Sequence, residues 1–232
     1  NTRPKHWQAL KRILRYLKHT SKQLCLTYQS THSESIQPKL CGWANPSIAL
    51  HGWTDSDWGG DVDDRKSTSG YVYTFAGRAI TWRLKKQAIV SLSSTEGEYV
   101  VATLVAKEGI GLKAILAEIN LIEEKPIEIY CDNQSCIKFA INPGMSDNIR
   151  HKSFKHHFIR DLVEEKKINL KFTPSTSMWA EFLTKSAPNH KHVQCCKNIG
   201  LLNITNTEDK DMEFQLFFLG GSVENYKKNN IN

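Results

Sequence analysis

The sequence predicts an α/β protein with a mixed five-stranded sheet and helices packed on it. Three short runs at 48–55, 70–76 and 78–84 are rich in aromatic and β-branched residues and are separated by turn residues, a pattern typical of antiparallel strands. A long helical pattern follows, and strands and helices then alternate along the chain. The predicted order is β-β-β-α-β-α-α-β-α, which requires a sheet that is part antiparallel and part parallel.

The long helix is predicted to begin at Ser94 or Thr95. Ser93 and Glu96 have the three-residue spacing of a capping box, in which each side chain satisfies a free backbone N–H at the start of a helix. The apolar residues that this helix offers for burial are Val101, Leu104, Val105, Leu112, Ile115 and Leu116.

The other two strands are predicted at 126–132 and 168–174, with helices at 133–142 and 153–167 between them. A last short helix is predicted at 177–185. The second of the middle helices has an apolar stripe of Phe154, Phe158, Ile159 and Leu162.

Changes in composition divide the chain into four parts. Residues 1–30 begin with an amphipathic helix at 4–18, with Trp7, Leu10, Leu14 and Leu17 on one face. Residues 31–47 are a polar linker that contains prolines and a glycine, and 48–202 form the α/β domain. Residues 203–232 are rich in asparagine and charge, so we expect a disordered tail. The first residue is Asn1, which suggests a piece of a longer protein.

The bulk composition favours a globular protein with a polyanionic partner. The formal net charge is +7 over 232 residues, of which 40% are hydrophobic. Six cysteines without a CxxC pair favour reduced thiols in the cytosol or nucleus. No apolar run approaches the roughly 18 residues of a membrane span, so no membrane partner is expected. The His and Cys residues near 151–157 and 190–196 lack zinc-finger spacing, so no structural zinc is expected.

Four carboxylates stand at ends of elements that this topology brings together. Asp55 closes the first strand of the sheet, Glu98 lies in the first turns of the long helix, Asp132 closes the fourth strand, and Glu181 lies on the last short helix. Converging carboxylates repel one another, and hard oxygen ligands are what Mg²⁺ prefers. Each carboxylate also has a structural interpretation when it is taken alone. Asp55 could be a turn residue, Glu98 could interact with the helix dipole, Asp132 could form an Asx turn, and Glu181 could face solvent.

Four blocks of the sequence are specific enough to indicate a family, namely DRKSTSGY, LSSTEGEY, CDNQS and AEFLTK. They resemble the ribonuclease H domain at the end of the Pol polyprotein of copia-type LTR retrotransposons, and the similarity runs from about Arg3 to Leu202. The helix at 4–18 resembles the end of the preceding reverse transcriptase, so residues 1–30 are expected to be its C-terminal segment.

The resemblance implies a ribonuclease H-like fold that cuts the RNA strand of RNA:DNA hybrids during reverse transcription. It implies two Mg²⁺ ions, replaceable by Mn²⁺, held by Asp55, Glu98, Asp132 and Glu181, with Asp57 as a second choice for Asp55. The ions activate a water for in-line attack. The implied partners are the hybrid and the reverse transcriptase portion of the same polyprotein, in a cytoplasmic virus-like particle or the nucleus.

The sequence departs from the family pattern at two places. Glu181 replaces the usual aspartate, and Lys152 and Ser153 replace an apolar and an acidic residue. These departures leave open an alternative, a decayed or domesticated module that binds nucleic acid or protein without cleaving.

Two basic segments are candidates for contact with the substrate. One is the loop of Arg65, Lys66, Ser67, Thr68 and Ser69, and the other is Lys85, Lys86 and Gln87. Both offer the charge and hydroxyl groups that bind phosphates, and such contacts position a duplex without reading its sequence. A solvated turn is the other interpretation of the loop.

Overall fold

The computed structural model describes residues 4–28, 49–61, 63–122, 124–142 and 155–204. The chain forms two compact units, one made of Asn1–Ser30 with Gly200–Asn232 and the other of Thr31–Ile199.

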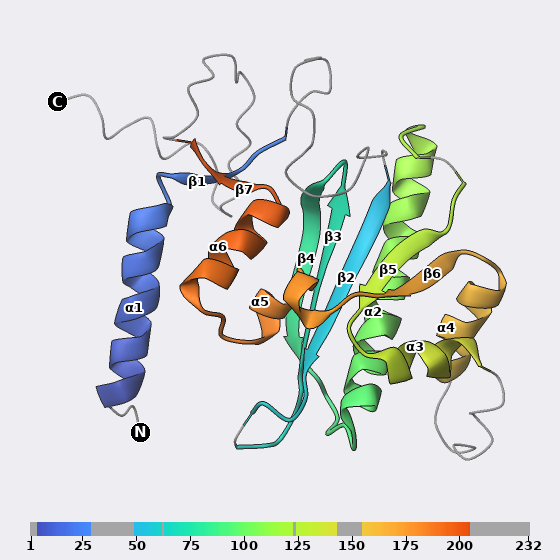
Figure 1. Cartoon of the computed structure of the whole chain (residues 1–232), viewed down its shortest axis with the longest axis horizontal. Coiled ribbons are helices and arrows are strands. Elements are labelled where there is room, and N and C mark those ends of the chain that lie inside the picture. The colour runs from blue at the N-terminus through green and yellow to red at the C-terminus, as the bar shows by residue number, and fades with distance from the viewer. Residues whose placement is uncertain (1–3, 29–48, 62, 123, 143–154, 205–232) are drawn as a thin grey trace. The chain divides into compact units, whose positions relative to one another are not determined.

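The larger unit is built on a five-stranded sheet with the strand order β4-β3-β2-β5-β6 (Figure 1). β2 (Leu50–Asp57), β3 (Thr68–Phe75) and β4 (Arg78–Lys86) pair antiparallel. β5 (Ile127–Cys131) runs parallel to β2, and β6 (Ile168–Phe172) runs parallel to β5. The predicted mixed sheet of five strands is therefore confirmed.

The long helix α2 (Ser94–Glu118) packs on one face of this sheet. Most of its buried residues recur at the spacing of a single helical face, namely Glu98, Val101, Ala102, Val105, Ala106 and Gly109. In its first three turns Gly97, Tyr99 and Thr103 are buried as well. Burial was predicted for Leu104 and Ile115 as well, and this was wrong. Both lie off that face and are 38% and 60% exposed.

The start of α2 has the predicted cap in a modified form. Ser93 is the N-cap, and its hydroxyl accepts a hydrogen bond from the backbone N–H of Glu96 at 3.2 Å. The carboxylate of Glu96 reaches one residue further back and accepts from the N–H of Leu92 at 2.7 Å. Two N–H groups at this end are thereby satisfied.

Two further helices, α3 (Gln134–Ile141) and α4 (Lys155–Glu164), contact α2 and complete this layer. Ile159 and Leu162 of the predicted stripe are buried in the core, and Phe158 packs against it. Phe154, Lys152 and Ser153 lie outside the described residues.

The residues after β6 contact β2 and β3 through α5 (Glu181–Thr184). In place of the helix predicted at 177–185 the chain forms a 3₁₀ turn, η3 (Ser175–Ser177), an extended residue, Met178, a turn at 179–180 and then α5. A helix that the sequence analysis did not place, α6 (Asn189–Asn198), comes next. The carbonyl of Ile199 then accepts from the N–H of Ala79 at 2.9 Å, which ties the end of this segment to β4.

The smaller unit contains α1 (Pro4–Thr20), β1 (Leu24–Leu26) and β7 (Leu201–Asn203). β7 pairs antiparallel with β1, so residues 200–202 group with the N-terminal segment and not with the α/β domain to which the sequence analysis assigned them. The predicted linker at 31–47 and most of the predicted tail lie outside the described residues. Within the described ranges, no helix combines the length and apolar character needed to cross a bilayer.

Candidate metal centre

Asp55 is buried near the end of β2, opposite Gly70 of β3. Its carboxylate accepts hydrogen bonds from the hydroxyl of Thr184 and from the ammonium of Lys185, the latter at 2.9 Å. A Cβ atom at Gly70 would lie 2.6 Å from Cγ2 of Thr184 and 3.2 Å from Cβ of Leu183. The missing side chain at Gly70 therefore lets α5 close onto the sheet and brings its last turn to Asp55.

Glu98 is buried in the second turn of α2. Its Oε1 accepts a hydrogen bond at 2.9 Å from the backbone N–H of Ser56, the residue after Asp55. Gly97 makes this approach feasible, because a Cβ there would lie 3.0 Å from the hydroxyl of Ser56. The helix is thus held against the strand at the residue next to Asp55.

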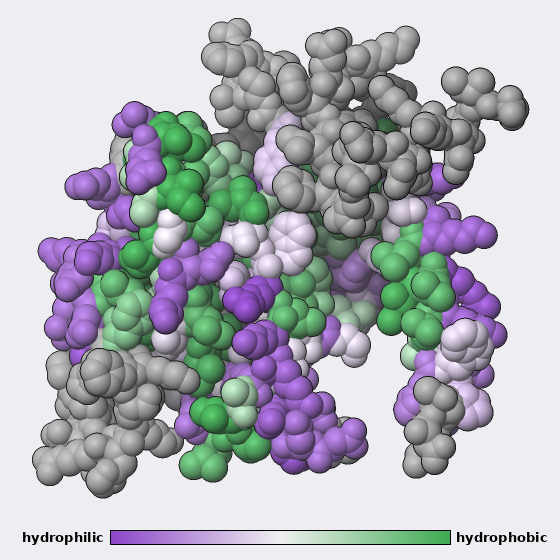
Figure 2. Space-filling model, turned by 180° about the vertical axis from the view of Figure 1, so that it is seen from behind, coloured by the Kyte–Doolittle hydropathy of each residue, from purple (hydrophilic) through white to green (hydrophobic). Residues whose placement is uncertain are grey.

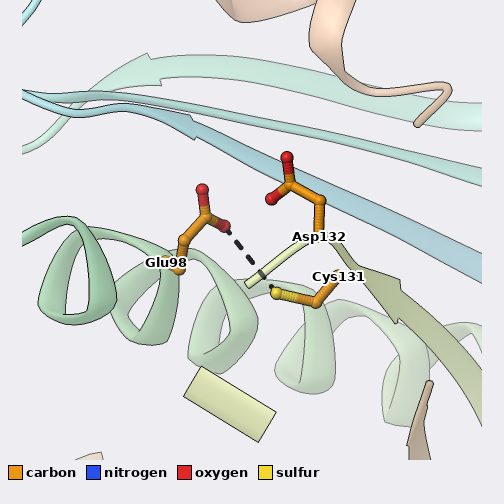
Figure 3. Close-up of side chains that lie close together, drawn as sticks. All are labelled: Glu98, Cys131 and Asp132. Atoms are coloured by element: carbon orange, nitrogen blue, oxygen red, sulfur yellow. Dashed lines mark hydrogen bonds between the residues drawn. The ribbon is translucent and has the colours of Figure 1, made fainter. Parts of the chain in front are cut away.

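Asp132 follows β5 directly, and its Oδ2 accepts a hydrogen bond from the hydroxyl of Ser175 at 2.7 Å. Glu98, Cys131 and Asp132 each offer one ligand atom within 4.8 Å of the others. Figure 3 shows these three side chains together, with Glu98 coming from α2 and the other two from the end of β5. Strand pairing between β5 and β2 places this end of β5 beside Asp55.

Burial dominates the electrostatics of the centre. It raises the pKa of Asp55, although the hydrogen bonds and charge of Thr184 and Lys185 act in the opposite direction. Burial also raises the pKa of Glu98 well above its ordinary value, helped by the neighbouring Cys131, Asp55 and Asp132. The neighbouring carboxylates thus disfavour ionisation of Glu98, and Lys185 is the cation that offsets the charge of Asp55.

A divalent cation with hard ligands suits this set of donors. Carboxylate oxygens from Asp55, Glu98 and Asp132 come from three separate elements, and Mg²⁺ prefers such oxygens. Cys131 is a poor ligand by comparison, because a hydrogen bond with Cys136 and burial raise the pKa of its thiol well above the ordinary value and keep it neutral. The residues present therefore fit Mg²⁺ or Mn²⁺ through their carboxylates.

Glu181, the fourth predicted ligand, begins α5 but directs its carboxylate elsewhere. It forms an ion pair with Lys191 of α6. Its charge nevertheless acts on Lys185, together with those of Asp55 and Asp132. The structure thus brings ligand atoms of Glu98 and Asp132 within 4.8 Å of each other, and Asp55 lies near enough to interact electrostatically with both. Glu181 is placed near Lys185, the partner of Asp55.

The sequence analysis missed three side chains that contact the carboxylates, namely Thr184, Lys185 and Ser175. Two of them stand in the AEFLTK block, one helical turn after Glu181. Their contact with Asp55 depends on the close approach of α5 to the sheet at Gly70, which the spacing along the chain does not reveal.

The two candidate substrate segments lie side by side, because Thr68 pairs with Lys86 and Ser69 with Lys85 across β3 and β4. Arg65 and Lys85 are exposed, Lys66 and Thr68 are half-buried, and Lys86 forms ion pairs with acidic residues of the loop before β3, namely Asp61 and Asp64.

Three residues of these segments are buried, and the prediction that they contact substrate is corrected accordingly. Gln87 donates to the hydroxyl of Ser69 at 3.0 Å, and the hydroxyl of Ser67 accepts from the N–H of Gly59 at 3.1 Å. Their polar groups are used inside the protein, so these three residues shape the loop instead.

Asp57, the second choice for the first ligand, is packed against the turn that follows β2. A Cβ atom at Gly60 would lie 1.7 Å from its Oδ2, and Gly59 has φ of +60°. Both glycines are therefore required by the close turn beside Asp57.

Comparison with known proteins identifies relatives over most of the chain. The chain is 37% identical over 201 residues to the retrovirus-related Pol polyprotein from transposon TNT 1-94 of Nicotiana tabacum. The aligned region covers 87% of this chain and 14% of the polyprotein. The chain is also 31% identical over 199 residues to the polyprotein from transposon RE2 of Arabidopsis thaliana, covering 86% and 13%. The chain is homologous to the Pol polyproteins of copia-type transposons.

The predicted family is thereby confirmed, and the chain spans about one seventh of the length of these Pol relatives. It is also 43% identical over 109 residues to the secreted RxLR effector protein 161 of Plasmopara viticola, covering 47% of this chain and 66% of that protein. No family model matches the chain.

The fold of this Pol segment is ribonuclease H-like, with three antiparallel strands followed by two parallel ones and helices packed on the sheet. Solved structures similar to it include the N-terminal ribonuclease H domain of a Mycobacterium tuberculosis protein, with a TM-score of 0.41, 12% identity and coverage of 65% of this chain and 98% of that one. Another is LC11-RNase H1 in complex with an RNA/DNA hybrid, with a TM-score of 0.40, 15% identity and coverage of 60% and 95%.

Proposed function

We propose that this chain is a Mg²⁺-dependent endonuclease that hydrolyses the RNA strand of RNA:DNA hybrids during retrotransposon reverse transcription. The observation that supports this most is the convergence of Asp55, Glu98 and Asp132 from β2, α2 and the end of β5. Carboxylates that lie close together beside one lysine, Lys185, fit the binding of divalent cations better than they fit a stabilising role. The reverse transcriptase portion of a longer polyprotein is the proposed partner.

In this proposal Asp55, Glu98 and Asp132 hold two Mg²⁺ ions, which Mn²⁺ can replace. Glu181 joins them when its carboxylate leaves Lys191. The bound ions supply water activation and stabilisation of the leaving oxygen. The chain contributes preorganisation, since the N–H of Ser56 orients Glu98 at 2.9 Å.

The bond changes are those of phosphodiester hydrolysis. A water oxygen bonds to phosphorus while the bond from phosphorus to the 3′ oxygen breaks. The 3′ oxygen takes up a proton and the water loses its protons to solvent. The products are a 3′-hydroxyl and a 5′-phosphate, and no covalent intermediate with the protein forms.

Substrate contacts are assigned to the surface residues of the two basic segments. Arg65 and Lys85 are exposed for phosphate contacts, and Lys66, which forms an ion pair with Asp64 at 3.7 Å, is the third candidate. Such contacts position a duplex without reading its sequence. Preference for a hybrid over duplex DNA requires contact with 2′-hydroxyl groups in the minor groove.

A cleavage assay tests the proposal. A fluorescently labelled RNA:DNA hybrid is incubated with the chain and Mg²⁺, next to the Asp132→Asn variant and a matched Glu128→Gln control. Glu128 lies on the same strand but pairs with Lys171, away from the centre. We expect cleavage of the RNA strand by the parent and the control, and loss of at least about 100-fold in Asp132→Asn. Equal cleavage by parent and Asp132→Asn would contradict the assignment.

The ion pair between Glu181 and Lys191 favours one alternative function. If the fourth carboxylate never reaches the centre, the chain is a ribonuclease H-like module that binds nucleic acid or protein without cleaving. Tight hybrid binding without cleavage in Mg²⁺ or Mn²⁺ is the result expected for such a module.

A further inference from the structure

Lys185 occupies the position from which a cation would contact Asp55. Its ammonium lies 2.9 Å from Oδ1 of Asp55, and the hydroxyl of Thr184 donates to Oδ2. Both oxygens of this buried carboxylate are thus used by two adjacent residues at the end of α5. A divalent ion that approaches Oδ1 from the side that the ammonium occupies takes the place of the ammonium.

The charge of Lys185 interacts with more carboxylates than Asp55 alone. Asp55, Asp132 and Glu181 all act electrostatically on its ammonium. Buried carboxylates without a counter-charge are strongly destabilising, so a metal-free centre requires a positive group of this kind. Lys185 satisfies the requirement from within the chain.

The ammonium of Lys185 has access to solvent on the other side of its contact with Asp55. Its side chain is 37% exposed, whereas that of Asp55 is fully buried. A lysine ammonium is a point charge on a flexible four-carbon stem, and it is readily rehydrated once it reaches solvent. The buried carboxylate remains in place while its partner is exchanged.

We propose that Lys185 is an internal counter-cation that neutralises Asp55 in the metal-free protein and is displaced when a divalent metal binds. The inference rests on the proposed function, because it concerns the same centre. It makes Lys185 a positioning residue that stabilises the empty centre and lowers its affinity for metal. Binding of Mg²⁺ is then an exchange of one cation for another.

The exchange is tested by measuring Mn²⁺ affinity in the Lys185→Met variant. Lys171→Met is the matched control, because it removes the same charge from a lysine of similar exposure, 42% against 37%, that is also paired with a carboxylate. Free Mn²⁺ is followed by electron paramagnetic resonance at fixed pH. We expect the Kd for Mn²⁺ to fall about tenfold in Lys185→Met, the order expected for removing a partly buried competing ion pair, and to change less than twofold in Lys171→Met.

General damage to the fold weakens metal binding, so tighter binding is a result that a merely structural role does not produce. An equal or higher Kd in Lys185→Met overturns the inference and leaves the proposed function intact. Failure of the parent chain to bind Mn²⁺ overturns the proposed function, and the inference with it.

A measurement on the parent chain covers the case in which Lys185→Met does not fold. The rate of lysine acetylation is followed by mass spectrometry with and without Mg²⁺. Displacement from Asp55 frees the ammonium of Lys185, so we expect its acetylation to accelerate several-fold on addition of Mg²⁺, while that of Lys171 stays constant. An unchanged rate at Lys185 under saturating Mg²⁺ contradicts the exchange.

Discussion

The carboxylate of Glu98 accepts a hydrogen bond at 2.9 Å from the backbone N–H of Ser56, so α2 is tied to β2 at the residue that follows Asp55. One contact therefore fixes the spacing of two carboxylates that lie 43 positions apart in the sequence, Asp55 and Glu98. It also keeps Glu98 buried, where its ionised form is disfavoured.

The metal-free protein should lose stability as the pH rises. The folded-state pKa of Glu98 lies well above the unfolded value. Its contribution is therefore fully present below the unfolded pKa of about 4.3 and is lost as the pH rises through the folded pKa. Glu98→Gln removes this loss and keeps an acceptor for Ser56. We expect the free energy of unfolding at pH 7 in EDTA to rise by about 1 to 3 kcal/mol, since one pKa unit corresponds to about 1.4 kcal/mol.

Urea unfolding between pH 5 and pH 8 measures this effect, with Glu128→Gln as the control. Burial raises the pKa of Glu128, but the hydrogen bonds and charge of Lys171 and the hydrogen bond of Tyr130 together lower it by more. The net shift of the pKa is therefore downward. The contribution of Glu128 is present above the unfolded pKa and is lost as the pH falls. Glu128→Gln should therefore not gain stability at pH 7, and a parallel gain in both variants would contradict the explanation.

The sheet could be predicted from the sequence because its signals are local. β2, β3 and β4 are runs of aromatic and β-branched residues between turns, and α2 has a cap and a regular apolar face. α6 could not be predicted in this way, because its ten residues contain few apolar side chains. The pairing of β1 with β7 joins three-residue strands that are about 175 positions apart, and no local pattern specifies such a contact.

Some residues of the candidate metal centre could likewise be predicted from the sequence, and others could not. Asp55 and Asp132 were predictable because each stands at the end of an apolar strand. Lys185 was not, because its position depends on the close approach of α5 over Gly70, which the spacing of residues along the chain does not reveal. The burial of Gln87 was missed for a similar reason, since a polar residue after two lysines resembles an exposed loop.

The aromatic stack beside the centre should anchor α5. Trp179 stacks on Trp53 with ring centroids 4.1 Å apart, and Trp53 stacks on Tyr130 at 4.3 Å. Trp179 lies two residues before Glu181, so its ring fixes the segment that leads to Lys185. Trp179→Ala should lower the free energy of unfolding by about 2 to 4 kcal/mol, from lost burial and stacking.

Trp82→Ala is the comparison for Trp179→Ala, because Trp82 is half exposed on β4. Its loss should cost less than about 1 kcal/mol. Both variants are measured by urea unfolding. Equal losses would show that the stack contributes nothing beyond the removal of a surface tryptophan.

Gln87 should be essential to the loop between β4 and α2. Its side-chain amide donates to the hydroxyl of Ser69 at 3.0 Å and to the carbonyl of Gly97 at 3.1 Å, and its own oxygen accepts from Ser91 at 2.8 Å. Gln87→Leu keeps the approximate size but leaves these buried groups without partners. We expect the free energy of unfolding to fall by about 2 kcal/mol, the cost of unsatisfied buried polar groups.

Lys85→Ala provides the control for Gln87→Leu in chemical unfolding, because Lys85 is exposed two residues earlier, near the end of β4. Its stability should stay within about 0.5 kcal/mol of the parent. A Gln87→Leu protein as stable as Lys85→Ala would mean that the buried hydrogen bonds are replaced by water.

Two glycines of α2 should respond in opposite directions to the same substitution. A Cβ atom at Gly109 would lie 2.2 Å from the hydroxyl oxygen of Tyr73, which is fully buried and donates to the carbonyl of Val105 at 2.8 Å. A Cβ atom at Gly111 meets nothing within 4 Å among the described residues. Gly111→Ala should stabilise the protein by up to about 1 kcal/mol through helix propensity. Gly109→Ala has the same intrinsic gain but overpacks the core, so we expect a net loss of about 1 to 2 kcal/mol.

The double variant Gly109→Ala/Tyr73→Phe distinguishes this steric explanation from a general weakening of the helix. Removal of the hydroxyl deletes the atom nearest to the new methyl group, so part of the loss caused by Gly109→Ala should be recovered. In a double-mutant cycle measured by urea unfolding, the double variant should be more stable than the sum of the two single losses predicts. The difference should be at least about 0.5 kcal/mol. Additive losses would mean that Gly109 is required for a reason other than its contact with Tyr73.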